Sequence, residues 1–188
     1  MDFVNMAKQG YEAYAGNSGD SGNTSSGQGF DLRSVLGMAK SEHGDESQHS
    51  YLEKAVGMLN DKQGEMNGHM DEEGSVQAHN KVFEEGDTKG ASPQEHGTAY
   101  AMSLFKKHFA GGENQTNEKD SDLLGKVIAE AKKLADEHLS HGSSDDKQSA
   151  VDSAAMTFGK LVVKSKMSGG TIGGSDSGGL SSLASKFL

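Results

Sequence analysis

A duplicated helical pattern constrains the fold of this 188-residue chain more than any other feature. The stretch 78–109 is echoed by 131–163, and residues 39–62 hold a shorter version. Each copy has two apolar-striped segments joined by a polar turn of Gly, Ser and Asp. Because apolar residues three and four apart share one face of a helix, each copy predicts a helical hairpin that must bury that face. We therefore predict an all-α fold, either a small bundle or a short solenoid of repeated hairpins.

Composition divides the chain into five parts. Residues 1–15 carry an apolar stripe at helical spacing, residues 30–167 hold the hairpins, and residues 180–188 carry a second short stripe. The stretches between them, 16–29 and 168–179, are rich in Gly and Ser, which is typical of flexible linkers. We therefore predict one helical-hairpin domain with a short amphipathic helix tethered at each end.

Local signals place helices within the domain. Ser92 and Glu95 flank the single Pro of the chain, a pattern that predicts a helix start capped by its own side chains, and we expect this helix to run to about Phe109. The acidic stretch 61–74 interrupts the apolar pattern. The clearest stripes comprise Leu52, Ala55, Val56 and Leu59; then Leu124, Val127, Ile128, Ala131, Leu134, Ala135 and His138; and then Val151, Ala154, Ala155, Phe158, Leu161 and Val162.

Charge limits the classes of partner. The formal net charge is −10, and residues 41–87 carry −9 of it, because twelve acidic residues there accompany three lysines. An acidic surface repels phosphate backbones, so we expect no nucleic-acid partner. No run of residues approaches the roughly 18 consecutive apolar residues of a membrane span, and the first residues form no basic leader. We expect no membrane association and a cytoplasmic or nuclear location.

The sequence lacks the motifs of common catalytic sites. The chain has no Cys, which excludes thiolate chemistry and disulfides. The Gly-rich run 169–174 is not followed by the Lys-Ser/Thr pair of a phosphate-binding loop, and no Gly-x-Ser-x-Gly occurs in a strand-turn-helix context. We therefore expect no enzymatic activity and no cofactor.

Histidines suggest one alternative, a ligand site. His49, His79 and His108 fall near the apolar stripes of their helices, from which they could converge on a metal ion or a haem. A site carried by one helix uses His or Glu partners three or four residues apart, and none of these three has such a His partner. His138 and His141 are three apart near a helix end, where they favour a capping role.

The acidic loop 61–73 suggests a second ligand site. Asp61, Glu65 and Glu72 belong to an alternating series of oxygen-bearing residues that superficially resembles a calcium loop. An EF-hand needs Gly at the sixth position of that loop, where this chain has Met66. The loop therefore predicts cation binding of low affinity rather than an ordered calcium site.

The tethered terminal helices are the candidates for protein contacts. Short amphipathic helices on linkers dock on their own domain, on a second copy, or in the groove of a partner. Membrane binding favours a basic polar face, and the first helix carries Lys8 alone. We expect a protein partner or self-association, with the contact residues Val4, Tyr11, Tyr14, Leu180, Leu183 and Phe187.

The order of several motifs resembles a known family. These motifs are QAHNKVFEEG at 77–86, SPQEHGTAYAMSLFKK at 92–107, LLGKVIAEAKKLADEH at 123–138 and GGLSSLASKFL at 178–188. In this order they resemble the small fungal proteins called beta-flanking proteins, which carry a domain of unknown function. The likeness spans about residues 71–188. It implies a fungal, intracellular setting and assigns no reaction, cofactor or catalytic residue.

Two functional hypotheses follow from these observations. The first is a soluble, non-enzymatic helical protein that acts through protein contacts or as a stress-related, hydrated stabiliser. The second is a helical bundle that holds a metal ion or small molecule by inward histidines or by the acidic loop 61–73.

Overall fold

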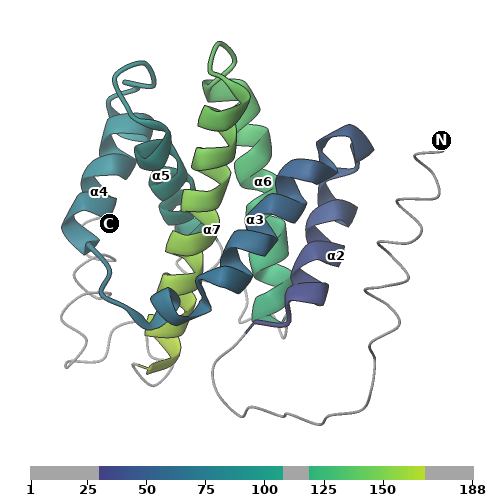
Figure 1. The fold of residues 1–188 in the computed structure, drawn as a ribbon. Helices are drawn as coiled ribbons and strands as arrows, with labels where there is room; N and C mark the ends of the chain where they lie inside the picture. The colour runs from purple at the N-terminus through teal and green to yellow at the C-terminus, as the bar shows by residue number, and fades with distance from the viewer. Residues whose placement is uncertain (1–29, 108–118, 168–188) are drawn as a thin grey trace, which may run out of the picture.

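The computed structural model describes residues 30–107 and 119–167 (Figure 1). The predicted terminal helices, their two linkers and His108 lie outside these residues, so the predictions made for them stay predictions. Within the described ranges, regular structure is helical throughout, which confirms the all-α fold class.

Six α-helices make up the described part of the chain. They are α2 (Leu32–His43), α3 (His49–Asp61), α4 (Glu72–His79), α5 (Pro93–Phe105), α6 (Asp120–His138) and α7 (Ser144–Met167). Three short elements join them, the 3₁₀ turns η1 (Glu46–Gln48) and η2 (Gln63–Asn67) and the π turn η3 (Asn80–Glu84). None of the helices in these ranges combines the length and the apolar character needed to cross a bilayer.

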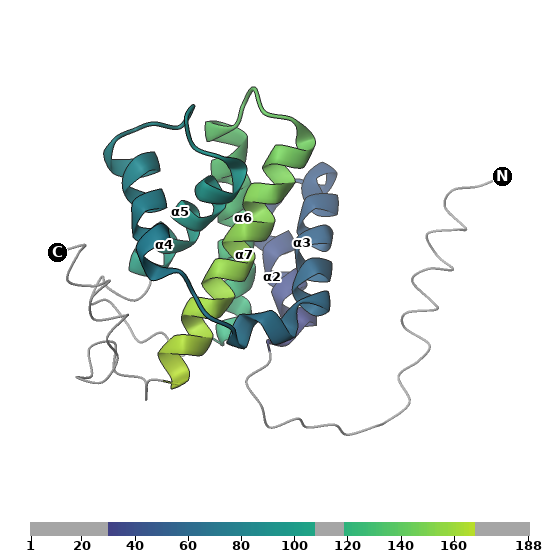
Figure 2. The same ribbon diagram turned by 60° about the vertical axis from the view of Figure 1, so that its left-hand side comes forward.

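The helices form three hairpins whose order in space differs from their order in the chain. The last hairpin, α6–α7, lies in the middle, with α4–α5 on one side and α2–α3 on the other (Figures 1 and 2). Its two neighbours pack against it mainly through α5 on α7 and α2 on α6. In a solenoid, consecutive repeats are neighbours. The described residues therefore form a bundle, because the third hairpin separates the first two.

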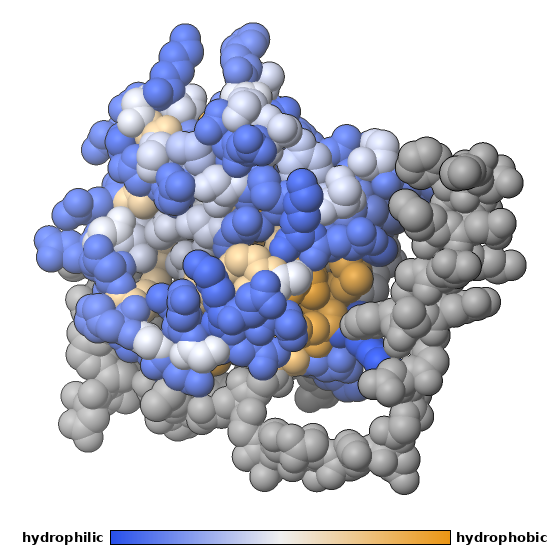
Figure 3. Space-filling view, in the orientation of Figure 1, coloured by the Kyte–Doolittle hydropathy of each residue, from blue (hydrophilic) through white to orange (hydrophobic). Residues whose placement is uncertain are grey.

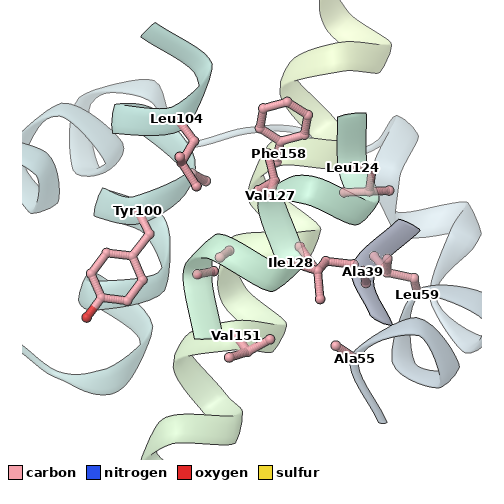
Figure 4. Close-up of a cluster of buried hydrophobic side chains, with 14 of the residues drawn as sticks. Ala39, Ala55, Leu59, Tyr100, Leu104, Leu124, Val127, Ile128, Val151 and Phe158 are labelled. Atoms are coloured by element: carbon pink, nitrogen blue, oxygen red, sulfur yellow. The ribbon is translucent and has the colours of Figure 1, made fainter. Parts of the chain in front are cut away.

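The predicted apolar stripes form the core. Every predicted stripe residue of α3 and of α7 is buried, and Phe158 of α7 belongs to the cluster shown in Figure 4. In the α6 stripe, Leu124, Val127 and Ile128 are fully buried. Helical periodicity alone was sufficient to find these residues, because a helix in a small bundle must turn its apolar face inward.

The predicted capping of α5 is also confirmed. The Ser92 hydroxyl accepts a hydrogen bond from the backbone N–H of Glu95, and the Glu95 carboxylate accepts one from the backbone N–H of Ser92 at 2.6 Å. That backbone hydrogen bond, with a contribution from the Lys81 ammonium 3.0 Å away, lowers the pKa of Glu95 to about 2. The α5 helix is thus fixed at the end that carries the loop from Gly86 to Ala91.

Two glycines let helices approach one another closely. A Cβ atom at Gly97 of α5 would lie 2.1 Å from the carbonyl oxygen of Ala150 in α7. A Cβ atom at Gly125 of α6 would lie 2.5 Å from the carbonyl oxygen of Val35 in α2. Because these distances are far below a normal contact, both of the main interfaces with the central hairpin require glycine at their closest point.

The acidic stretch 61–74 contains more structure than the sequence predicts. The η2 turn buries Met66, whose Sδ lies 3.1 Å from the Cβ position of Gly159 in α7. Asp71 then caps α4 by accepting a hydrogen bond from the backbone N–H of Gly74 at 2.9 Å. A single 3₁₀ turn anchored by one methionine is too short to give a periodic pattern, which is why the sequence showed only a break.

Candidate functional site

Five aromatic side chains gather at the end of the bundle where the loop after η3 and the α6–α7 loop meet. We call them the ring cluster. Phe83, Tyr100 and His138 lie at its centre, with ring centroids 5.6–6.3 Å apart. His79 packs on Phe83 at 5.3 Å, and His96 lies 6.0 Å from His138. The cluster therefore joins η3, α5 and the last turn of α6 through edge and tilted ring contacts.

Hydrogen bonds fix His96 and Tyr100 within this cluster. His96 is fully buried, and its Nε2 lies 2.9 Å from the carbonyl oxygen of Thr88. A carbonyl oxygen can only accept, so Nε2 carries the proton and donates. His96 Nδ1 is then free to accept from the Tyr100 hydroxyl at 3.1 Å, and that hydroxyl also lies 3.3 Å from the carbonyl oxygen of Leu134. The chain of contacts links the loop at Thr88 to α5 and α6.

Burial keeps these groups neutral. It lowers the pKa of His96, against a smaller opposite effect of the hydrogen bond to Thr88. Burial likewise lowers the pKa of His79, and it raises the pKa of Tyr100. The reason is the same in each case, because a charged ring loses its hydration inside the bundle. His79, His96 and Tyr100 are therefore uncharged at neutral pH.

A pocket of about 760 Å³ lies beside the ring cluster. We call it the loop pocket. His138 belongs to both, since it lines the pocket and its ring packs at a tilt on Tyr100 in the cluster. Within the described residues its buried Nδ1 has no hydrogen-bond partner. The remaining lining residues come from the two loops and the adjoining helix ends: Thr88, Lys89, Ala91, Pro93, Glu137, Leu139, Ser140, His141, Gly142 and Asp146.

The pocket carries charges of both signs. Lys89 and Glu137 are exposed, whereas the Asp146 carboxylate is already engaged, because it accepts hydrogen bonds from the backbone N–H and the hydroxyl of Ser143 at 2.9 and 2.8 Å. Asp146 therefore forms a capping box with Ser143, the residue before α7. The arrangement suits a small polar group that hydrogen-bonds to the His138 ring.

The predicted ligand residues are spread over the bundle. His49 begins α3 and Asp61 ends it, Glu65 lies in η2 next to Lys62, and Glu72 begins α4, where it pairs with Lys164. His79 lies in the ring cluster. Within residues 30–107 and 119–167, no group of three or more His, Cys, Asp or Glu side chains is placed to hold a metal ion. The structure thus does not bring these candidates together.

Sequence reasoning missed His96 and Tyr100. The two residues are four apart on the same face of α5 as the buried Leu104, and this spacing was visible in the sequence. The spacing gave no functional signal, because the partners of the two side chains are backbone carbonyl oxygens, that of Thr88 in the loop and that of Leu134 in α6. His138, which the sequence favoured as a helix-end cation, is the last residue of α6, and its ring packs inward.

A second polar cluster lies between α3, α6 and α7. The Lys132 side chain is 1% exposed, pairs with Asp136, and places its Nζ 4.6 Å from the centroid of the Tyr51 ring. Asp136 also pairs with Lys147 of α7 at 3.3 Å. Burial raises the pKa of Asp136, but hydrogen bonds and charges from Lys132 and Lys147 outweigh it, and the net pKa is lowered. A buried ammonium therefore depends on this one carboxylate.

We expect Asp136→Ala to destabilise the protein more than Lys132→Met does. Removing the carboxylate leaves the Lys132 charge buried without its partner, which costs about 3–5 kcal/mol for a fully buried ion pair. We expect about 2 kcal/mol here, because Asp136 is 40% exposed and water reaches the end of the pair that it occupies. Lys132→Met keeps the apolar stem and removes the charge, so we expect a change within about 1 kcal/mol. Denaturant unfolding of both variants and of the double variant measures this difference. Equal losses in the two single variants would contradict it.

Stability should fall on mild acidification. Burial depresses the folded-state pKa of His79 and His96 below the ordinary 6.5, so the unfolded chain binds protons first as the pH drops. The contribution of the two neutral rings to the free energy of unfolding is complete above pH about 6.5. It is lost as the pH falls below that value, by at most about 1.4 kcal/mol per pH unit for each ring. Urea unfolding at pH 7.5, 6.5 and 5.5 measures the slope. His96→Gln should reduce it, and a flat profile in the parent would overturn the expectation.

Comparison with known proteins finds a family that matches part of the chain. The family described as Domain of unknown function (DUF7721) matches residues 31–113, which cover α2 to α5 and less than half of the chain. The central hairpin α6–α7 lies outside the match, and the match overlaps the predicted beta-flanking likeness only over residues 71–113. No curated protein and no solved structure matches the chain. The first two hairpins of this chain are therefore similar to a domain to which no function is attached.

Proposed function

We propose that this chain is a non-enzymatic helical protein of the cytoplasm or nucleus that acts through protein contacts. One observation carries the proposal, an apolar area on the outer hairpin α2–α3. Its residues pack on the core but remain partly exposed: Phe30, Leu32, Leu36 and Met58. Figure 3 shows apolar surface gathered over α2 next to α3. We call these four residues the α2–α3 patch. Partly exposed apolar side chains gathered on one flank favour an interaction site.

The terminal segments give the proposal its second support. Residues 1–15 and 180–188 carry predicted amphipathic stripes on Gly- and Ser-rich linkers, which suits helices that dock on apolar surfaces. The predicted likeness to fungal beta-flanking proteins is consistent with a role that needs no catalytic residue. High Gly content and an acidic surface are likewise consistent with a hydrated stabiliser in the same setting.

Light scattering tests the proposal. We expect that removing residues 1–15 and 180–188 changes the oligomeric state, the melting temperature, or both, because apolar surfaces lose their partners. Leu36→Glu should change the same quantities by charging the α2–α3 patch. Gly37→Glu is the matched control, since Gly37 is the exposed neighbour on α2 with open space around its Cβ position. If trimming and Leu36→Glu both leave the oligomeric state and the melting temperature unchanged, protein contact is not the function.

The loop pocket supports a second candidate, binding of a small polar ligand or a metal ion. The observation that favours it is the buried His138 Nδ1, which lacks a hydrogen-bond partner within the described residues and belongs to a residue that also lines the pocket. Ligand binding to the folded state raises the melting temperature by mass action. We expect a panel of divalent cations and polar fragments to raise it in the parent and not in His138→Ala. No rise with any member of the panel would exclude this candidate.

A further inference from the structure

We propose that residues 1–15 of this chain form a helix that docks on the α2–α3 patch of the same molecule and covers it. This inference rests on the proposed function, since it names the occupant of the proposed contact surface. It also means that a partner protein can reach the patch only after it displaces residues 1–15.

The patch lies mainly along one side of α2. Leu32 and Leu36 are one turn apart on α2, beside the inner residues Val35 and Ala39, which are fully buried. They form the flank of α2, and Met58 lies on α3, which diverges from α2 beyond the turn that joins them (Figure 1). The hairpin buries its inner face against α6 and α7, whereas this flank remains partly exposed.

The segment that we assign to the patch has a matching stripe. Val4, Ala7, Tyr11 and Tyr14 recur at spacings of three and four residues, and as a helix they span about 15 Å at 1.5 Å per residue. The stripe ends in two tyrosines, whose apolar rings can cover leucine while their hydroxyls reach water at the rim. The apolar stripe of the segment can therefore pack on Leu32 and Leu36.

The connection between segment and patch favours docking within one molecule. Phe30, the first described residue, belongs to the patch and follows the 14-residue linker 16–29 directly. A flexible linker of that length has a root-mean-square span of about 20 Å, comparable to the length of the helix that it must place. Such tethers give effective concentrations near 1 mM, so even a contact with a Kd of about 0.1 mM would be about 90% occupied. A second copy at micromolar concentration competes poorly.

Paramagnetic relaxation tests the placement in the full chain. The chain has no Cys, so Gln9→Cys introduces one spin-label site on the polar face of the segment. We expect the label to broaden amide signals of residues 30–36 and 58–61 at least fivefold more than those of α5. Equal or absent broadening in these regions would overturn the proposal. Adding spin-labelled chain to unlabelled ¹⁵N chain should leave the patch signals sharp, and broadening in that mixture would show docking on a second copy instead.

A pair of charge variants tests the stripe itself. Tyr11→Asp in the spin-labelled chain should reduce the broadening of the patch at least fivefold, because it places a charge in the apolar contact. Asn5→Asp adds the same charge off the stripe and should change it less than twofold. Equal effects of the two variants would exclude docking through the stripe. If the patch shows no broadening while trimming the ends still changes the oligomeric state, the protein-contact function stands and the docking within one molecule is wrong.

Discussion

Replacing Gly97 with Ala should remove about 3 kcal/mol of folding stability. A Cβ atom there would meet the backbone of α7, 2.1 Å from the Ala150 oxygen and 2.9 Å from the Ala154 nitrogen, as well as the Ser153 Cβ at 2.6 Å. Backbone atoms cannot rotate away as side chains do, so α5 and α7 must separate. Overpacking costs about 1–3 kcal/mol and occasionally more, and this site is at the upper end because α5 and α7 form the most extensive interface in the described bundle.

Separation of α5 and α7 would also break polar contacts between them. The Ser153 hydroxyl donates to the Gln94 carbonyl oxygen at 3.0 Å, and the Gln94 side-chain amide donates to the Ser149 hydroxyl at 2.9 Å. These bonds are largely exposed and each adds little, but all of them depend on the same close approach. We therefore expect the loss to appear in one cooperative denaturant transition rather than as local fraying.

Gly57→Ala is the matched control for this prediction. Gly57 is also a helical glycine, in the middle of α3, but no atom lies within 4 Å of its Cβ position. Without a clash, Ala should stabilise α3 by about 0.5–1 kcal/mol through its higher helix propensity. The comparison separates the steric effect of the added Cβ atom from its effect on helix propensity. The close approach is refuted if the two variants change the free energy of unfolding in the same direction.

The second large effect is expected from Phe158→Ala. Phe158 is fully buried in the core, and its ring meets the Phe105 ring edge-on with centroids 6.0 Å apart. Truncation leaves a cavity where the ring now fills the space between α5, α6 and α7 (Figure 4). Substitutions of this type cost about 3–5 kcal/mol, a large part of the 5–15 kcal/mol that holds a typical domain folded. Denaturant unfolding at pH 7.5 gives the value.

Phe83→Ala provides the comparison for Phe158. Phe83 contacts the rings of Tyr100 and His138 but is itself 37% exposed, so its truncation opens a surface notch that water fills. We expect a cost of about 1–2 kcal/mol, since part of the ring is hydrated already in the folded state. A loss at Phe83 as large as that at Phe158 would mean that the ring cluster, rather than the apolar centre, is the main source of stability.

The fold could be predicted to the level of its helices. The α3 and α7 stripes and the Ser92 capping box were visible because they depend on neighbours within one or two turns. The η2 turn was not visible, because its anchor Met66 packs on Gly159, far away in the chain. Glycines were harder still. Gly57 and Gly97 look alike in the sequence, and only the position of α7 shows that one of them is required.

The candidate site was predicted less well than the fold. The sequence identified His79 as an inward histidine but grouped it with His49, which lies elsewhere in the bundle. The ring cluster instead joins His79 to His96 and His138, from three different helices. Nothing in local spacing encodes that meeting. The family match over residues 31–113 ends before α6, so it does not include His138 or most of the loop pocket.

The sequence by itself determined that this protein is helical, where α5 begins, and which faces the main helices bury, because periodicity and capping are set by residues close together in the chain. The tertiary structure alone decided that the last hairpin lies between the first two, and so made a bundle rather than a solenoid. It also brought His96 to His138 and left the flank of α2 partly exposed. These outcomes depend on close approach between distant segments, which Gly97 and Gly125 permit and no local pattern specifies.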